Sequence, residues 1–267
     1  SVINQTYQNI EIICVNDGST DNSLEILQQY SDKITIISQT NHGLASALNV
    51  GIKQMKGKWL KWFSPDDAMY SYTIKTLVDE AKKHSNTIVY SNWNIIDENG
   101  KKLREFQESN YNELSNFEYN IRLLDGQQIN VNTSLIPLSL FEKCSMRKLD
   151  DPVAVDYDFF LHAALLYNTN FYLIQKPLIK YRIHTQQLSH KNIFKTLKYM
   201  SKIKSEILQN FDETSRNKLI SELERYQNSK STKRKIMEFS IQFLSFVPSY
   251  ISDRILLFYL NKIRQSR

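Results

Sequence analysis

The stretch Val15-Asn16-Asp17-Gly18-Ser19-Thr20-Asp21 closes an apolar run, Ile10–Val15, and decides how the first part of the chain folds. Apolar, β-branched residues followed at once by Asn, Asp, Gly and Ser predict a buried strand that leaves a sheet into a tight polar loop. The residues after the loop, 21–27, have the pattern of a capped helix. Ligands of open α/β sheets bind where strands end and helices begin, so Asp17 is a candidate ligand-binding carboxylate. An ordinary strand-to-helix turn is the alternative interpretation.

Strand and helix patterns alternate outward from this loop as far as residue 92. Strands are predicted at 10–15, 34–38, 59–63 and 88–90, and helices at 23–30, 43–55 and 74–83. This alternation predicts an α/β fold with a mostly parallel sheet flanked by helices. Further on, the sequence predicts a hairpin-type turn at 97–100, helices at 115–124 and 154–167, extended segments at 133–136, 171–174 and 179–183, and helix nearly throughout from about residue 190.

A second acidic loop, Ser64-Pro65-Asp66-Asp67, follows the apolar segment 59–63. Proline fixes φ and ends the strand. Adjacent carboxylates repel each other unless a divalent cation lies between them and a phosphate, and oxygen ligands with room for phosphate suit Mg²⁺ or Mn²⁺. The loop therefore predicts a metal site at Asp66 and Asp67, with a helix N-cap as the alternative.

A third acidic cluster and a basic strand complete the set of candidate residues. Asp156 and Asp158 stand at the start of the predicted helix 154–167, where one could act as a general base and where capping is the alternative. Being two residues apart, they cannot share one helical face. Downstream, Arg182 and His184 alternate to the same side of a predicted strand and could converge on a diphosphate, or could simply face solvent.

Taken together and in order, these segments resemble the family 2 glycosyltransferases, which have the GT-A fold. The resemblance covers residues 1–190. It rests on Asn4-Gln5-Thr6-Tyr7-Gln8-Asn9-Ile10-Glu11-Ile12, the Asn16–Asp21 loop, Asn41-His42-Gly43-Leu44-Ala45, Asn49-Val50-Gly51-Ile52, the Ser64–Asp67 loop, Asp156-Tyr157-Asp158 and Tyr181-Arg182-Ile183-His184.

The resemblance implies an inverting enzyme that moves a sugar from a nucleotide-diphosphate donor, usually a UDP-sugar, with Mg²⁺ or Mn²⁺ as cofactor. It implies that Asp17 contacts the base and that Asp66 binds the metal, with Asp67 beside it in the donor site. It also implies that Asp156 is the general base for the acceptor hydroxyl, and that Arg182 and His184 contact the donor diphosphate. The expected acceptor is a glycan or a lipid-linked molecule in cell-surface polysaccharide synthesis.

Three departures from the family pattern support an alternative, a catalytically impaired or non-catalytic relative that binds nucleotide-sugars. Ser64 stands where the family usually has Asp, and Leu48 replaces an Arg that is common in the family. The family's first strand would precede Ser1, so we expect the chain to be an N-terminally truncated member.

Charge and composition suggest how the chain is organised and where it acts. Residues 191–267 carry 16 Lys and Arg against 7 Asp and Glu, whereas residues 1–190 carry 18 against 21. We therefore expect a GT-A domain at 1–190 and a basic helical extension at 191–267. Aromatic and basic residues in 230–267 predict peripheral binding to an anionic membrane, with packing on the catalytic domain as the alternative. Two separated cysteines favour the cytoplasm, and the acidic body argues against a nucleic-acid partner.

Overall fold

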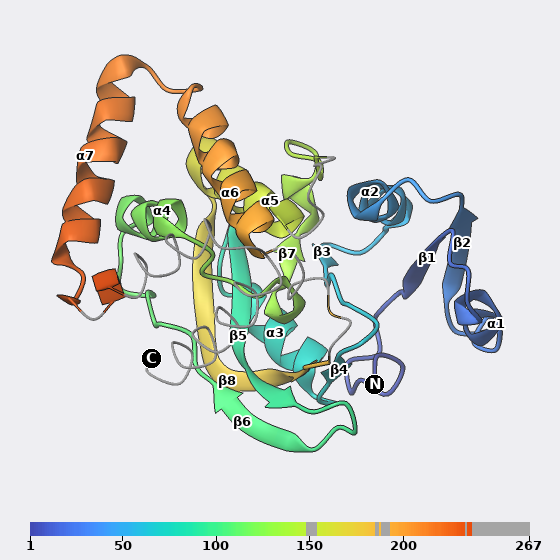
Figure 1. The fold of residues 1–267 in the computed structure, drawn as a ribbon. Coiled ribbons are helices and arrows are strands. Elements are labelled where there is room, and N and C mark those ends of the chain that lie inside the picture. Colours follow the sequence, from blue (N-terminus) through green and yellow to red (C-terminus); the bar gives the residue numbers. More distant parts are fainter. Residues whose placement is uncertain (148–153, 185–186, 188–192, 233, 237–267) are drawn as a thin grey trace. The chain divides into compact units, whose positions relative to one another are not determined.

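The computed structural model describes residues 1–147, 154–184, 187, 193–232 and 234–236 (Figure 1). The chain divides into two compact units. The first combines Ser1–Glu113 with Ile129–Arg182, and the second combines Leu114–Gln128 with Ile183–Arg267. The segment Leu114–Gln128 thus leaves the first unit and joins the second. The predicted boundary at residue 190 stays a proposal.

The first unit begins with two parallel strands, β1 (Ile13–Asp17) and β2 (Thr35–Gln39), as the sequence predicts. Helix α1 (Ser23–Gln28) connects them, and α2 (Leu44–Gln54) follows β2. Gly51 of α2 lies so close to β1 that a Cβ there would be 3.3 Å from Val15 Cγ2. Because Asp17 pairs with Gln39, the carboxyl ends of both strands lie at one edge of the pair.

The same unit contains a four-stranded sheet with the order β4-β8-β5-β6. Its strands are β4 (Ala68–Met69), β5 (Thr87–Ile96), β6 (Lys102–Phe106) and β8 (Asn170–Arg182). Of the pairings described in this sheet, that of β5 with β8 is parallel and the other two are antiparallel. A separate pair, β3 (Trp59–Leu60) with β7 (Ile136–Pro137), is also antiparallel.

The prediction of a mostly parallel sheet is therefore confirmed only in part for the described residues, because their sheets are partly antiparallel. Two of their five strand pairings are parallel, β1 with β2 and β5 with β8. The predicted turn at 97–100 does form, with Gly100 at φ 85°, and it folds β6 back against β5. This hairpin and the short strands β3 and β4 account for the antiparallel pairings.

Two expected extended segments differ from the prediction, the first because of a contact distant in sequence and the second because of local bonding. Strand β3 ends at Leu60, because the chain beyond it turns toward Asn132 and bonds to it rather than to a neighbouring strand. The segment expected to be extended at 133–136 begins instead in a 3-10 turn, η1 (Val131–Thr133). Both the backbone N–H and the hydroxyl of Thr133 donate to the Asn130 carbonyl, so local bonding replaces sheet pairing there.

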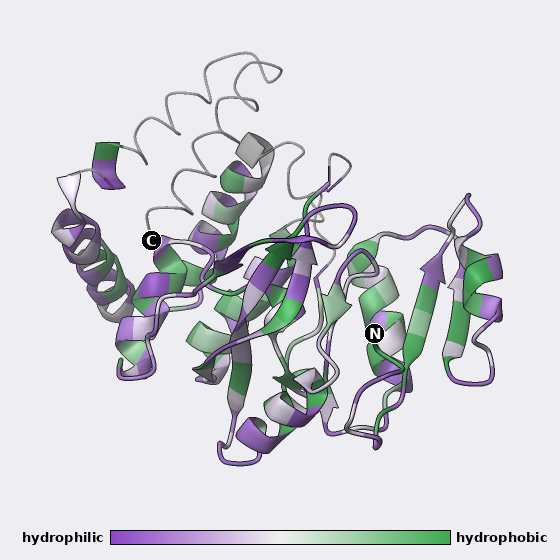
Figure 2. Cartoon of the chain, turned by 90° about the horizontal axis from the view of Figure 1, so that it is seen from below, coloured by the Kyte–Doolittle hydropathy of each residue, from purple (hydrophilic) through white to green (hydrophobic). Residues whose placement is uncertain are grey.

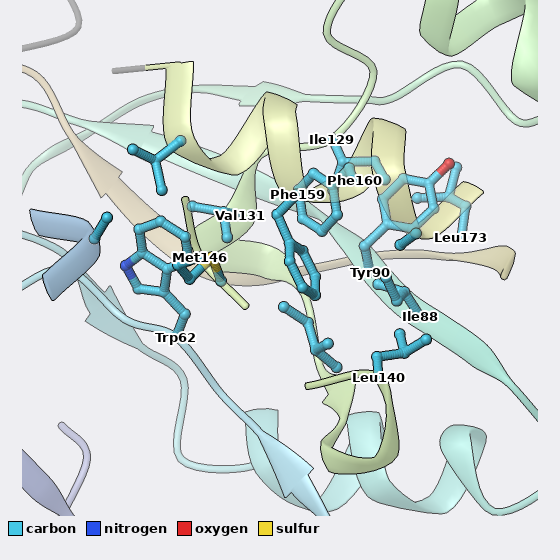
Figure 3. Close-up of a cluster of buried hydrophobic side chains, with 14 residues drawn as sticks. Trp62, Ile88, Tyr90, Ile129, Val131, Leu140, Met146, Phe159, Phe160 and Leu173 are labelled. Atoms are coloured by element: carbon cyan, nitrogen blue, oxygen red, sulfur yellow. The ribbon is translucent and has the colours of Figure 1, made fainter. Parts of the chain in front are cut away.

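The core of the first unit lies between helix α5 (Val155–Tyr167) and the strands β5 and β8 (Figure 3). Phe159 and Phe160 of α5 are each 1% exposed, and their rings meet edge to face at 6.0 Å. They join Ile88 and Tyr90 of β5 in the buried cluster. Helix α3 (Thr73–Ala81) and the 3-10 turn η2 (Leu138–Leu140) add further buried residues. This core holds the start of α5 and the first half of β8 in place.

The second unit contains α4 (Asn116–Asp125), α6 (Ile193–Leu208) and α7 (Glu213–Ser229). Ser115 and Glu118 form a capping box at the start of α4. Its last residue, Asp125, pairs with Lys230 at 2.6 Å, and both side chains are buried. Helix α7 is rich in hydrophilic residues (Figure 2). In the part of the chain that the structure describes, no helix has the length and apolar character needed to cross a bilayer. Most of the tail predicted to bind a membrane, 237–267, lies outside the described residues.

Candidate functional site

Asp17 stands at the carboxyl end of β1 and bonds to the loop that follows β2. Its Oδ1 accepts from Gln39 Nε2 at 2.7 Å and from the His42 N–H at 2.9 Å, and its Oδ2 accepts from the Gly43 N–H at 2.9 Å. Partial burial would raise the pKa of Asp17, but these hydrogen bonds outweigh it and hold the pKa below its ordinary value. Asp17 is thus an ionised carboxylate that joins two loops at the edge where parallel strands end.

Gly18 lets these two loops approach each other. Its φ is 72°, and a Cβ at this position would lie 2.7 Å from the backbone nitrogen of Asn41. A side chain here would strain the backbone and push the Asn41 loop away. The glycine that follows Asp17 is therefore required by the contact between the loops.

The second acidic loop is organised around Asn132, a buried residue of η1. Asn132 Oδ1 accepts from both the N–H and the hydroxyl of Ser64 at 3.0 Å, and its Nδ2 donates to Asp67 Oδ2 at 2.6 Å. The ammonium of Lys61 donates to the Asn132 carbonyl and to the Trp62 carbonyl. One asparagine thus bonds to both the first and the last residue of this loop.

Burial shifts the pKa values of two charged residues here. It raises the pKa of Asp67 to about 6, assisted by the nearby negative charge of Asp66 and opposed by hydrogen bonds from Arg182 and Asn132 and by the charge of Lys61. Burial also lowers the pKa of Lys61 to about 7, while the charge of Asp67 acts in the opposite direction. Near neutral pH the two groups therefore titrate in adjoining ranges.

Arg182, at the end of β8, is joined to the same loop. Its backbone N–H donates to Asp67 Oδ1 at 2.8 Å, and its guanidinium Nε donates to the Asp66 carbonyl at 2.8 Å. The Nη1 group donates to the carbonyls of Asp97 and Glu98 in the β5–β6 turn. The predicted contact of Arg182 with a diphosphate stays a prediction, as does that of His184, which belongs to the second unit.

The two carboxylates at the start of α5 have different surroundings. Asp158 is 2% exposed, and its Oδ2 accepts from Arg147 Nε at 2.8 Å. Asp156 is partly exposed and its Oδ1 accepts from the Tyr157 N–H at 2.8 Å. Asp158 is therefore committed to an ion pair inside the fold, whereas Asp156 is partly exposed to solvent.

The structure joins Asp66, Asp67 and Arg182 through direct hydrogen bonds, and it places Asp17 and Asp156 on other elements of the same unit. Asn132 and Arg147 are two residues that the sequence did not indicate. Each meets its partner only through folding, and an isolated Asn or Arg in a polar segment carries no signal of such a contact. Within the described ranges, no group of three or more His, Cys, Asp or Glu side chains is placed to hold a metal ion.

The profile of the glycosyl transferase family 2 matches residues 1–139, just over half of the chain. The chain belongs to glycosyl transferase family 2. Over 197 residues this family 2 chain is 36% identical to an uncharacterized glycosyltransferase of Rickettsia bellii strain RML369-C. That match covers 72% of the present chain and 28% of the relative, so the chain spans under a third of the length of that protein.

Solved structures of TarS from S. aureus have a similar mixed α/β fold. TarS 1–349 in complex with UDP superposes on this family 2 chain with a TM-score of 0.58 at 16% identity, covering 91% of this chain and 72% of TarS 1–349. The complex with UDP-GlcNAc gives a TM-score of 0.57 at 15% identity and covers 94% and 76%. At this identity the likeness shows the GT-A-like fold alone.

Proposed function

We propose that this chain is the catalytic part of an inverting glycosyltransferase that moves a sugar from a UDP-sugar to a hydroxyl group of a glycan or lipid-linked acceptor. The observation that carries the proposal is the Asp17 carboxylate, fixed between two loops at the ends of parallel strands in a family 2 chain. A fixed carboxylate at such an edge is suited to accept hydrogen bonds from a base. TarS has been solved with UDP and with UDP-GlcNAc, which supports a uridine nucleotide as the donor.

The acidic loop offers ligands that suit a divalent metal bound mainly by the donor. Asp67 is buried whereas Asp66 is partly exposed, so Asp66 is the carboxylate of this loop that a metal bound with the donor could reach. Mg²⁺ commonly binds one or two carboxylates together with substrate phosphates and waters, and the Asp66 carboxylate with the donor diphosphate would supply such ligands. A metal bound there would offset negative charge on the diphosphate.

Asp156 is the proposed general base. It would accept the proton of the acceptor hydroxyl while the hydroxyl oxygen forms a bond to the anomeric carbon. The bond from that carbon to the donor diphosphate breaks on the opposite face, and UDP leaves with the bonding electrons. Asp156 lies in the first turn of α5, where the helix macrodipole favours a negative charge.

The test is a comparison of donor binding and donor turnover in the wild type and Asp156→Asn. With UDP-GlcNAc and other UDP-sugars as probes, we expect Mn²⁺-dependent UDP binding in both proteins and sugar transfer in the wild type alone. Full transfer by Asp156→Asn would remove Asp156 from the mechanism. Binding of UDP-sugars by the wild type without turnover would favour the alternative, a non-catalytic nucleotide-sugar-binding relative, which the serine at position 64 also suggests.

A further inference from the structure

We propose that Asp67 and Asn132 form a positioning pair that fixes the Ser64–Asp67 loop, and that Asp67 acts through its hydrogen bonds rather than as a ligand of the donor or its metal. This inference rests on the proposed function, because the loop that the pair fixes carries Asp66.

Asn132 is built into the fold as a support for this loop. It is 5% exposed, and its own backbone N–H donates to Asn130 Oδ1 at 3.1 Å. This bond fixes the backbone of η1 at Asn132. Its side-chain oxygen binds the first residue of the loop, Ser64, and its side-chain nitrogen binds the last, Asp67. Such a residue sets the distance between the two ends of the loop, and therefore the position of Asp66 between them.

Asp67 has the surroundings of a buried acceptor. It is 8% exposed, Oδ1 accepts from the Arg182 N–H at 2.8 Å, and Oδ2 accepts from Asn132 Nδ2 at 2.6 Å. Both donors are fixed, one by a strand and the other by a 3-10 turn. A buried carboxylate held in this way connects the loop to β8, whereas Asp66 is the partly exposed member of the pair of aspartates.

The directions of these hydrogen bonds allow the two side chains to exchange places. With a carboxylate at position 132 and an amide at position 67, Ser64 still donates to one oxygen at position 132, and the amide donates to the other. The Arg182 N–H then donates to the amide oxygen at position 67. The number of charges is unchanged, so Lys61 still has a carboxylate nearby. Each single substitution fails to satisfy this pattern. In Asp67→Asn, the new amide nitrogen faces either Asn132 Nδ2 or the Arg182 N–H, so two donors oppose each other. In Asn132→Asp, the carboxylates at positions 67 and 132 face each other and repel.

The experiment is a double-substitution cycle of D67N, N132D and the combined variant. Two readouts are taken in each protein, the urea midpoint of unfolding and the affinity for UDP with Mn²⁺ by isothermal titration calorimetry. We expect each single change to weaken Mn²⁺-dependent UDP binding by roughly 10- to 100-fold and to lower the urea midpoint. The combined variant should return to within about threefold of the wild-type affinity and recover the midpoint.

The matched control is D66N, alone and with N132D. Asp66 is the neighbouring aspartate, and its loss should abolish the Mn²⁺ dependence of UDP binding with no recovery on adding N132D. A D67N/N132D protein that regains its midpoint but not its affinity would overturn the inference, because the Asp67 carboxylate would then itself contact the metal or donor. The inference would also be overturned if the urea midpoint of the combined variant fell by the sum of the decreases in D67N and N132D. If the wild type does not bind UDP with Mn²⁺, the proposed function fails, and coupling of the midpoints still decides whether the two residues form a pair.

Discussion

The carboxylate of Asp17 accepts the backbone N–H of Gly43 at 2.9 Å and so joins the end of β1 to the loop that follows its parallel neighbour β2. Gly43 is also the residue that precedes α2, and its φ of 87° turns the chain into that helix. The proposed base-contacting residue thus holds the entrance of α2 as well. Its substitution should affect both nucleotide binding and the stability of this edge.

We expect Asp17→Asn to weaken UDP binding by roughly 10-fold and to lower the free energy of unfolding, because an amide has a single oxygen for three donors. The pKa of Asp17 is lowered in the folded state, so its contribution to stability is fully present above the unfolded pKa of about 3.9 and is lost as the pH falls through the folded value. Urea midpoints of both proteins at about pH 6 and about pH 3 measure this. The gap between them should narrow at the lower pH, and a gap that widens would contradict the assignment.

Gly18→Ala tests the close approach of the two loops, and Gly100→Ala is the matched control. Both glycines have positive φ, but only Gly18 has a backbone atom within 3 Å of the added Cβ, whereas nothing lies within 4 Å at Gly100. Gly100→Ala should cost about 1 kcal/mol for its conformation, and Gly18→Ala about 1–3 kcal/mol more for the clash. Thermal unfolding measures both. An equal decrease in stability in Gly18→Ala and Gly100→Ala would show that the Asn41 loop can move away from the added Cβ without cost.

Lys61→Met should change how stability depends on pH above neutrality. The pKa of Lys61 is lowered to about 7 in the folded protein, so between that pH and the unfolded value of about 10.4 the unfolded chain binds a proton that the folded chain has lost. The free energy of unfolding attributable to Lys61 therefore rises with pH across this window. Urea unfolding at several pH values should show a flatter profile for Lys61→Met than for the wild type. Parallel profiles would mean that Lys61 stays protonated.

Asp158→Asn and Asp156→Asn should separate stability from activity at the start of α5. Asp158 pairs with Arg147, whose side chain is 38% exposed, so its loss should cost about 1–3 kcal/mol rather than the larger penalty of a fully buried pair. Asp156→Asn should change the free energy of unfolding by less than about 1 kcal/mol. Chemical denaturation of both variants gives the comparison. If Asp156→Asn lowers the free energy of unfolding by more than Asp158→Asn does, Asp156 has a structural role.

Local patterns in the sequence predict the elements whose causes are local. The strand predicted at 10–15 and found at 13–17, the helix 43–55 and the helix 154–167 are confirmed to within a few residues, since apolar periodicity and flanking polar residues determine them. Strand β8 runs unbroken from Asn170 to Arg182 where two extended segments were expected, because pairing with β5 carries the chain past Pro177 through shifts of register. Such pairing depends on residues about 80 positions away.

The candidate site follows the same division. Carboxylates that follow apolar segments can be recognised from the sequence. Asp17 ends β1 and Asp156 lies in the first turn of α5, whereas Asp66 lies in the loop between β3 and β4. The contact of Asn132 with Asp67 spans 65 residues and joins a 3-10 turn to a loop, so the sequence near either residue does not predict it. The distant residues that hold a site residue in place are thus harder to predict from the sequence than the site residue itself.

The pairing of Asp125 with Lys230 joins residues 105 positions apart in one compact unit. Translation proceeds from the N-terminus at roughly 5–20 residues per second, so α4 waits on the order of 5–20 seconds after its synthesis before α7 is available. During that interval the helix can rely on its capping box and on contacts with residues made before Lys230, such as Lys204, which donates to the Asp125 carbonyl at 3.1 Å. The order of synthesis therefore makes the charge cluster around Asp125 one of the last parts of the protein to form.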